Sequence, residues 1–270
     1  MFVKTIGDMQ KCNLEILKSF DTLCKDNAVS YSLAYGNILG LIRDNGFIPW
    51  DDDIDVFMLR GEYEKLLSLP KESFDSNYEL VVPEDLDYFY DFIPRYVCKK
   101  YTAERVDVFD KDHKPIIENL RIDIMIIDDS FVDQKKHRSQ IRRLRKIYLQ
   151  TTKYRIHVLD RPFYIRLIKW AVGLTAGRES LQSLMERYRR VSLECTEKSS
   201  VVYISNSLPN ELGMQYDREW FEHPVETMLC GVRTYIPMNP EGLLKMWYGN
   251  YMEMPPEDRR KPDHFKLDLD

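Results

Sequence analysis

The chain has 270 residues, of which 44% are hydrophobic and 12% aromatic, and its formal net charge is -5. This length can bury a sizeable core, and the composition is that of a soluble globular enzyme. The five cysteines are odd in number, widely spaced and never in a C-x-x-C pair, which argues against a disulfide framework and a thiolate zinc site. No segment approaches the roughly 20 apolar residues of a transmembrane helix, and the N-terminus lacks a secretory-signal pattern, so we expect a cytoplasmic protein.

Hydrophobic periodicity predicts alternating helices and strands in the first half of the chain. Helices are expected over residues 9–24, 36–43 and 61–69. Strands are expected over residues 29–34, 53–58, 79–82, 93–99, 105–109 and 119–127, with 93–99 and 105–109 forming a hairpin or lying as neighbours. This order predicts an α/β (α+β) fold in which helices pack against a mixed sheet.

The second half of the chain changes in character. Residues 134–200 are helical and basic, and between Lys135 and Arg178 thirteen Lys or Arg accompany one acid, a local net charge of +12. Either a solvated helix face or a surface for an anionic partner explains this imbalance. Residues 201–270 hold short irregular elements rich in Pro, Tyr, Trp and Met. We therefore predict three regions, 1–133, 134–200 and 201–270.

One segment of the basic region, residues 161–174 (RPFYIRLIKWAVGL), is mostly apolar. Its polar stripe is narrow and consists of Arg166, Lys169 and Gly173. The segment is too short to span a bilayer but suits an interfacial helix on an anionic membrane. A buried core helix or a dimer helix is the alternative interpretation.

The most informative stretch is residues 34–58, AYGNILGLIRDNGFIPWDDDIDVFM. If the acidic run is extended, strand alternation places Asp51, Asp53 and Asp55 on one face and Asp52 on the other. Three like charges on one face repel one another unless a cation lies among them. Carboxylate oxygens are ligands for hard divalent cations, so we predict a Mg²⁺ site, with Mn²⁺ as the alternative ion.

Gly36 and Asn37 precede the apolar pattern of the short helix at 36–43. Backbone N–H groups at a helix start bind anions, so this turn is a candidate phosphate site. An anion site beside a hard cation is what phosphoryl chemistry needs, because the metal neutralises charge on the phosphate oxygens.

Asp123 lies within the apolar strand LRIDIMIID, and a buried carboxylate needs a partner or a metal. Arg121 has the same strand parity and would face the same side, as a partner for a carboxylate or a phosphate. Taken alone, Asp123 is best explained by a salt bridge with Arg121. If its strand lies beside the one that carries Asp53 and Asp55, three carboxylates converge and can hold one or two ions.

A calcium loop is a different interpretation of the same run. The EF-hand spacing of positions 1, 3, 5 and 12 is matched by Asp51, Asp53, Asp55 and Glu62. However, Val56 stands where the loop requires Gly, and Pro49 prevents an entering helix. We therefore favour the phosphoryl-transfer interpretation.

The segment GNILGLIRDNGFIPWDDDIDVFM resembles the signature of the LicD family. The resemblance continues in Tyr31, Arg60, Tyr63 and the Arg-Ile-Asp strand, and returns in the C-terminal WYGNYMEMPPEDRRKPDHF. One departure is Asn37, where the family usually has Thr. The resemblance implies a nucleotidyltransferase-like core over 1–133, with a helical basic insertion over 134–200 and a C-terminal region over 201–270 that completes the active site.

The resemblance also implies roles for individual residues. The catalytic carboxylates would be Asp53, Asp55 and Asp123. The metal ligands would be these three with Asp51. The substrate-binding residues would be Gly36, Asn37, Arg43, Arg121 and His264.

The implied activity is transfer of a phospho-alcohol from a CDP-linked donor to a sugar hydroxyl of a cell-surface glycan, with release of CMP. The best-known bacterial members use CDP-choline and decorate teichoic acid or lipopolysaccharide. Their acceptors are built on lipid carriers, so contact with the inner membrane leaflet is expected, and no nucleic-acid partner is.

Three alternatives stay open at this stage. A true nucleotidyltransferase would release pyrophosphate, another CDP-linked alcohol would use the same phosphoryl chemistry, and a metal-binding relative could be catalytically silent. A choline donor also needs aromatic faces for its quaternary ammonium. Two aromatic groups are candidates: Tyr88, Phe89, Tyr90, Phe92 and Tyr96, or Trp247, Tyr248 and Tyr251.

Overall fold

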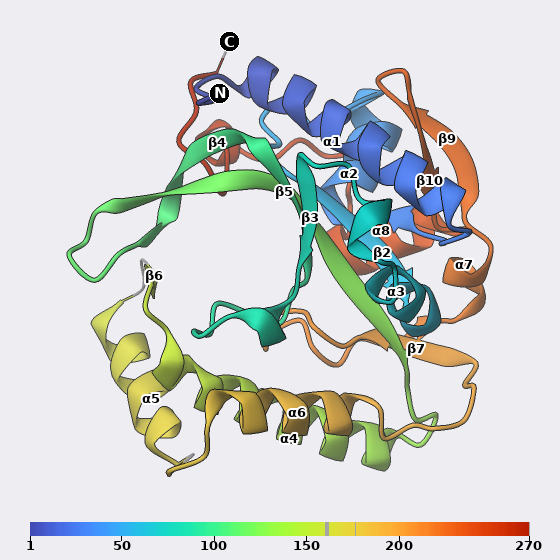
Figure 1. Cartoon of the computed structure of the whole chain (residues 1–270). Coiled ribbons are helices and arrows are strands. Elements are labelled where there is room, and N and C mark those ends of the chain that lie inside the picture. The colour runs from blue at the N-terminus through green and yellow to red at the C-terminus, as the bar shows by residue number, and fades with distance from the viewer. Residues whose placement is uncertain (160–161, 176, 270) are drawn as a thin grey trace.

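The structure is a computed structural model that describes residues 1–159, 162–175 and 177–269. Its centre is a curled mixed sheet in the strand order β1-β2-β5-β4-β3 (Figure 1). The bounds of these strands are β1 Ser32–Leu33, β2 Ile54–Leu59, β3 Tyr78–Val81, β4 Arg95–Phe109 and β5 Pro115–Asp129. β2 and β5 are parallel, whereas the other neighbours along this order pair antiparallel. The predicted mixed sheet is therefore confirmed.

Shorter strands extend the sheet and form a separate hairpin. β6 pairs with β4, and β7 pairs with β5 and β8. β9 and β10 make a two-stranded antiparallel sheet of their own. Their bounds are β6 Val158–Leu159, β7 Val201–Ile204, β8 Tyr216–Asp217, β9 Val225–Leu229 and β10 Val232–Ile236.

Some helices pack around the sheet, and others form a separate layer that lies below it in Figure 1. The helices of the core and C-terminal region are α1 Ile6–Asp26, α2 Tyr35–Leu39, α3 Arg60–Leu67, α7 Glu219–Glu222 and α8 Pro240–Tyr248. The lower layer consists of α4 Gln134–Thr151, α5 Phe163–Leu174 and α6 Leu181–Ser192. Within the described part of the chain, no helix has the length and apolar character needed to cross a membrane.

The main hydrophobic core lies between the sheet and α1. Ile16 and Leu17 of α1 and Ile122 and Ile124 of β5 are completely buried there. A second core is centred on the basic insertion, where Leu144 and Leu184 pack with aromatic residues of the neighbouring segments, including Phe92 and Tyr203. Side chains of the insertion, of β7 and of the segment before β4 therefore pack in one core, which attaches the insertion to the sheet.

Three predicted strands differ from the structure. The stretches 93–99 and 105–109 belong to one strand, β4, whose pairing with β5 is interrupted by register shifts after Val97 and Glu104. The strand expected over 29–34 is reduced to two residues. Its first part is not paired, because Ala28 has a left-handed backbone (φ +51°) and the N–H of Ser30 donates to the carboxylate of Glu62.

Gly40 allows the chain to fold back closely between α2 and β2. It begins a π-helical turn, Gly40–Asp44. A Cβ atom on Gly40 would lie 2.6 Å from both the carbonyl oxygen of Gly46 and the backbone nitrogen of Ile48. Backbone atoms at that distance cannot move aside as a flexible side chain could.

Replacing Gly40 by Ala should therefore destabilise the fold by about 1–3 kcal/mol through overpacking, which lowers the melting temperature by roughly 2–10 °C. Gly61→Ala is the matched control, because Gly61 lies in α3 with no atom within 4 Å of its added Cβ. It should be neutral or stabilising by up to about 1 kcal/mol. Equal melting temperatures for the two variants, measured by calorimetry, would contradict this account of the turn.

Candidate active site

Many charged side chains line a cavity of about 540 Å³ at the start of β2 and beside the middle of β5. Residues from α2, β2, β4, β5, the basic insertion and the C-terminal segment all contribute to its wall. The members predicted from the sequence are Gly36, Asp51, Asp53, Asp55, Arg121, Asp123 and His264. Segments far apart in the sequence therefore meet here.

Two of the carboxylates are brought together by strand pairing. β2 and β5 run parallel, and Asp55 is the register partner of Asp123. Neighbouring residues in register project to the same face of a sheet, so both side chains reach the cavity. The prediction that these two strands are adjacent is confirmed.

The acidic run before β2 is not extended strand as predicted. β2 begins only at Ile54, so Asp51, Asp52 and Asp53 lie in a loop and do not follow strand alternation. The prediction that Asp52 faces away from the site is wrong. Oxygens of Asp52 and Asp53 and a ring nitrogen of His264 lie within 4.8 Å of one another, a grouping that could hold a metal ion.

The C-terminal segment closes over this loop. Oδ2 of Asp52 accepts hydrogen bonds from the backbone N–H groups of His264 (3.0 Å) and Phe265 (2.7 Å). Nε2 of His264 lies 2.9 Å from Oδ2 of Asp53. Burial alone would lower the pKa of His264, but the charge of Asp53 and the hydrogen bond to it outweigh burial and raise the pKa to about 10. The imidazole is thus held as a cation that offsets part of the acidic charge.

Asn37 holds the acidic loop through three hydrogen bonds. Its Oδ1 accepts a hydrogen bond from the N–H of Asp55 at 2.7 Å. Its Nδ2 donates to Oδ2 of Asp51 at 3.3 Å and to the carbonyl of Asp53 at 3.1 Å. Asn37 is 1% exposed, so in this structure its side chain supports the loop and does not line the cavity. Gly36 does line it, and an added Cβ would lie 3.1 Å from Oδ2 of Asp51.

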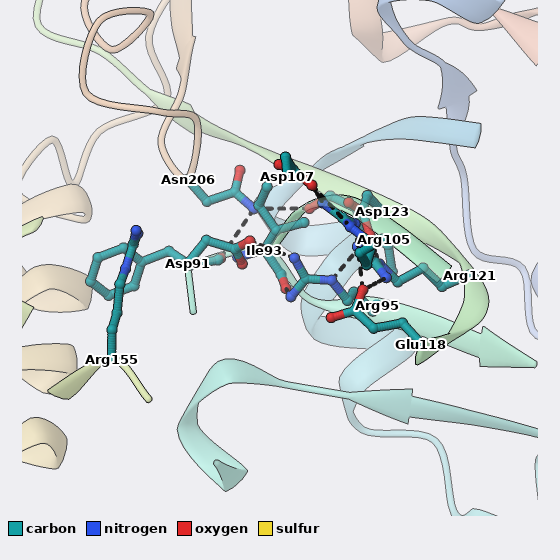
Figure 2. Close-up of polar contacts among 12 residues, drawn as sticks. Asp91, Ile93, Arg95, Arg105, Asp107, Glu118, Arg121, Asp123, Arg155 and Asn206 are labelled. Atoms are coloured by element: carbon teal, nitrogen blue, oxygen red, sulfur yellow. Dashed lines mark hydrogen bonds and ion pairs between the residues drawn. The ribbon is translucent and has the colours of Figure 1, made fainter. Parts of the chain in front are cut away.

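Asp123 is held by guanidinium groups (Figure 2). Its Oδ1 lies 2.9 Å from Nε of Arg121 and 3.2 Å from Nε of Arg95. Burial would raise the pKa of Asp123, but Arg121 and then Arg95 outweigh it and the pKa is lowered. The predicted salt bridge with Arg121 is therefore present, and it lies inside the predicted site.

The guanidinium groups are themselves linked by further acids in the same view (Figure 2). Glu118 accepts from Arg121 at 2.6 Å and lies 3.4 Å from Arg105, while Asp91 pairs with Arg95. One arginine of the wall stands apart from this network. Arg155 comes from the basic insertion, and its Nε has no hydrogen-bond partner within the described residues.

The carboxylates of the acidic loop and Asp55 have no such guanidinium partners among the described residues. Burial, followed by the charge of Asp53, raises the pKa of Asp51 and of Asp55 well above the ordinary value. The same two causes raise the pKa of Asp52 to about 6. A buried cluster that resists full ionisation is the donor set expected for a bound divalent cation, whose charge would offset the repulsion.

Arg43 is not brought to the site. Its guanidinium forms an ion pair of 2.9 Å with the adjacent Asp44, and it is not among the residues that line the cavity. Sequence reasoning also missed several wall residues: Asp52, Arg95, Arg105, Arg155 and Glu211. Arg95 is the antiparallel register partner of Asp123, a relation that only the sheet topology reveals.

Comparison with known proteins shows what this chain is similar to. Residues 28–118 match the family model described as LicD/FKTN/FKRP, nucleotidyltransferase domain. The chain is also 27% identical over 273 aligned residues to the lipopolysaccharide cholinephosphotransferase LicD of Haemophilus influenzae, with 97% of each chain covered. The chain therefore resembles the LicD family, and residues 28–118 match its nucleotidyltransferase domain. The LicD domain match contains the acidic loop and Arg95 but ends before Asp123 and His264. The similarity to the Haemophilus protein extends over 97% of the chain.

Proposed function

We propose that this protein transfers phosphocholine from CDP-choline to a sugar hydroxyl of a lipid-linked glycan, a precursor of lipopolysaccharide or teichoic acid, and releases CMP. The similarity to a cholinephosphotransferase supports the choice of group. The observation that carries the proposal is the shared cavity, which is lined both by the acidic loop and by Asp123 with the arginines that pair with it. Cation-binding and phosphate-binding groups therefore face the same space.

The acidic donors fit a hard divalent cation. Carboxylate oxygens are the ligands that Mg²⁺ and Mn²⁺ prefer, and we assign them to Asp51, Asp53, Asp55 and Asp123. When bound, the ion would neutralise charge on the diphosphate and on the leaving CMP. Asp52 and His264 would hold the loop against the C-terminal segment.

The chain's own residues would orient the donor and move one proton. Arg121 and Arg155 would bind the phosphate oxygens, because guanidinium groups match phosphate geometry. The sugar hydroxyl oxygen attacks the choline-side phosphorus, the bond from that phosphorus to the oxygen of CMP breaks, and the hydroxyl proton passes to a carboxylate. Asp123 is a poor acceptor because its arginine partners lower its pKa.

The assignment of regions follows from this proposal. Residues 1–133 would form the catalytic core, and 201–270 would complete it through His264. The insertion, residues 134–200, would supply Arg155 and contact the acceptor or the membrane. We place the protein in the cytoplasm, at the inner face of the cell membrane.

Incubating the protein with CDP-choline, Mg²⁺ and a glycan acceptor should yield CMP and a phosphocholine-modified glycan, identified by mass spectrometry. Asp53→Asn should lower the rate at least about 100-fold, since it removes charge stabilisation worth several kcal/mol. The exposed Asp258→Asn is the matched control and should keep the wild-type rate.

The same assay separates the alternatives. Pyrophosphate released from CTP would indicate a nucleotidyltransferase, and preference for CDP-ethanolamine, CDP-ribitol or CDP-glycerol would indicate another alcohol. Full activity of Asp53→Asn would exclude the assigned site, and no turnover of any CDP donor by the wild type would favour a catalytically silent relative.

Helix α5 supports the proposed membrane contact because its apolar side faces outward. Its exposed apolar side chains are Phe163, Tyr164, Leu167, Ile168, Trp170 and Leu174. Residues 163, 167, 170 and 174 follow helical spacing and share one face. Gly173 lies on the inner side, where an added Cβ would be 3.2 Å from Lys153. The alternative of a buried core helix therefore does not hold, and the surrounding basic region favours an anionic surface as the partner.

Vesicles that contain phosphatidylglycerol should bind the protein, and added salt should weaken binding because part of the attraction is electrostatic. Leu167→Ser should weaken binding about tenfold, the loss expected for one buried leucine. Val132→Ser, which replaces an exposed apolar residue outside α5, should bind as the wild type does. Equal binding to neutral vesicles, or a stable dimer that hides α5, would contradict the membrane proposal.

A further inference from the structure

An unpaired acid lies at the rim of the active-site cavity. Glu211 is in the segment between β7 and β8, and it lines the cavity together with Leu208. Its backbone N–H donates to the carbonyl of Leu208. Its carboxylate forms no hydrogen bond or ion pair with any residue that the structure describes, unlike the acids of the arginine wall. A carboxylate placed in this way is available to a cationic ligand.

Two tyrosines line the same cavity and come from two helices, α2 and α8, that contact each other. Tyr248 ends α8 and is 44% exposed, so part of its ring is open to a ligand. Tyr35 begins α2 and packs against Trp247 with ring centroids 4.9 Å apart. Tyr35 has a φ of +42°, a backbone conformation that is unusual for a bulky residue and that occurs often at ligand sites.

Burial and negative charge on acids of the site raise the pKa of both tyrosines. Burial raises the pKa of Tyr248, and Asp55, Asp51, Asp53 and Glu211 raise it further. Burial raises the pKa of Tyr35 as well, and both Glu211 and Asp55 add to the effect. The two phenol rings therefore lie within electrostatic reach of Glu211 and of the proposed metal ligands.

The other aromatic group considered in the sequence is less suited to a cation. The ring of Tyr90 is already covered by the guanidinium of Arg95, at 5.0 Å from the ring centroid. Arg155 lies over Phe89 in the same way, at 5.3 Å. Tyr96 is 1% exposed and does not line the cavity. A second cation at this end would be repelled by the arginines, whereas phosphate would be attracted.

We propose that Tyr248, Tyr35 and Glu211 form a subsite for a quaternary ammonium group, the choline end of the donor. The tyrosine faces attract a cation that has no N–H donors, and Glu211 provides the opposite charge. A primary amine could instead form hydrogen bonds that this pair of rings does not satisfy. This inference rests on the proposed phosphocholine transfer and adds the residues that select the alcohol.

Isothermal titration of the whole protein with CDP-choline and with CDP-glycerol, in Mg²⁺ and without acceptor, tests the subsite. Tyr248→Leu and Glu211→Gln should each weaken CDP-choline binding about threefold to thirtyfold, the range for a cation–π or partly desolvated charge contact. Binding of CDP-glycerol should change less than about twofold, because it carries no ammonium. Tyr248→Phe keeps the ring and should bind CDP-choline nearly as the wild type does.

Glu219→Gln, which alters an exposed glutamate of α7, is the matched control and should leave both affinities unchanged. Equal weakening of both donors by Tyr248→Leu and Glu211→Gln, or no effect on either, would overturn the subsite. A wild type that binds CDP-glycerol as well as CDP-choline would also overturn it, while transfer of another alcohol could stand. Failure of the wild type to bind any CDP compound would instead remove the proposed function itself.

Discussion

Repulsion among buried carboxylates is the constraint to which the rest of this site responds. Parallel pairing of β2 and β5 sets Asp55 beside Asp123, and the loop before β2 adds three more acids. Asp123 is neutralised by Arg121 and Arg95. From the part of the chain that the structure describes, the other acids receive only the imidazolium of His264 and a few N–H donors, and burial still raises the pKa of Asp55. This remaining negative charge is why we infer a divalent cation there.

The cavity is divided electrostatically into zones. Arginines line it on β4, β5 and the basic insertion, the acidic loop lines it before β2, and the tyrosines with Glu211 line it on α2, α8 and the segment after β7. In a donor with a diphosphate and a quaternary ammonium, the negative diphosphate would suit the arginines and the positive ammonium would suit the tyrosines and Glu211. Three separate stretches of chain are needed for this arrangement, because Arg155 comes from the basic insertion and His264 from the C-terminal segment. The outward apolar face of α5 belongs to the same insertion as Arg155, so acceptor delivery and catalysis can share one surface.

Local patterns allowed part of this architecture to be predicted. Apolar runs located β2 and β5, and Asp123 between isoleucines indicated that β5 contributes to the site. The orientation of Asp52 could not be predicted, because alternation holds only within a strand and the strand begins after it. Arg95 was missed because its contact with Asp123 depends on antiparallel register across β4 and β5. Arg43 was assigned to substrate from its place in a motif, but the adjacent Asp44 pairs with its guanidinium.

The central claim is that acids from two strands bind one divalent ion or a close pair of ions. Titrating the protein with Mn²⁺ and following free Mn²⁺ by electron paramagnetic resonance tests it most directly. The wild type should show saturable binding that Mg²⁺ displaces. Asp55→Asn and Asp123→Asn should each weaken this binding, although the two residues lie in different strands. Wild-type Mn²⁺ affinity in both variants would contradict the account.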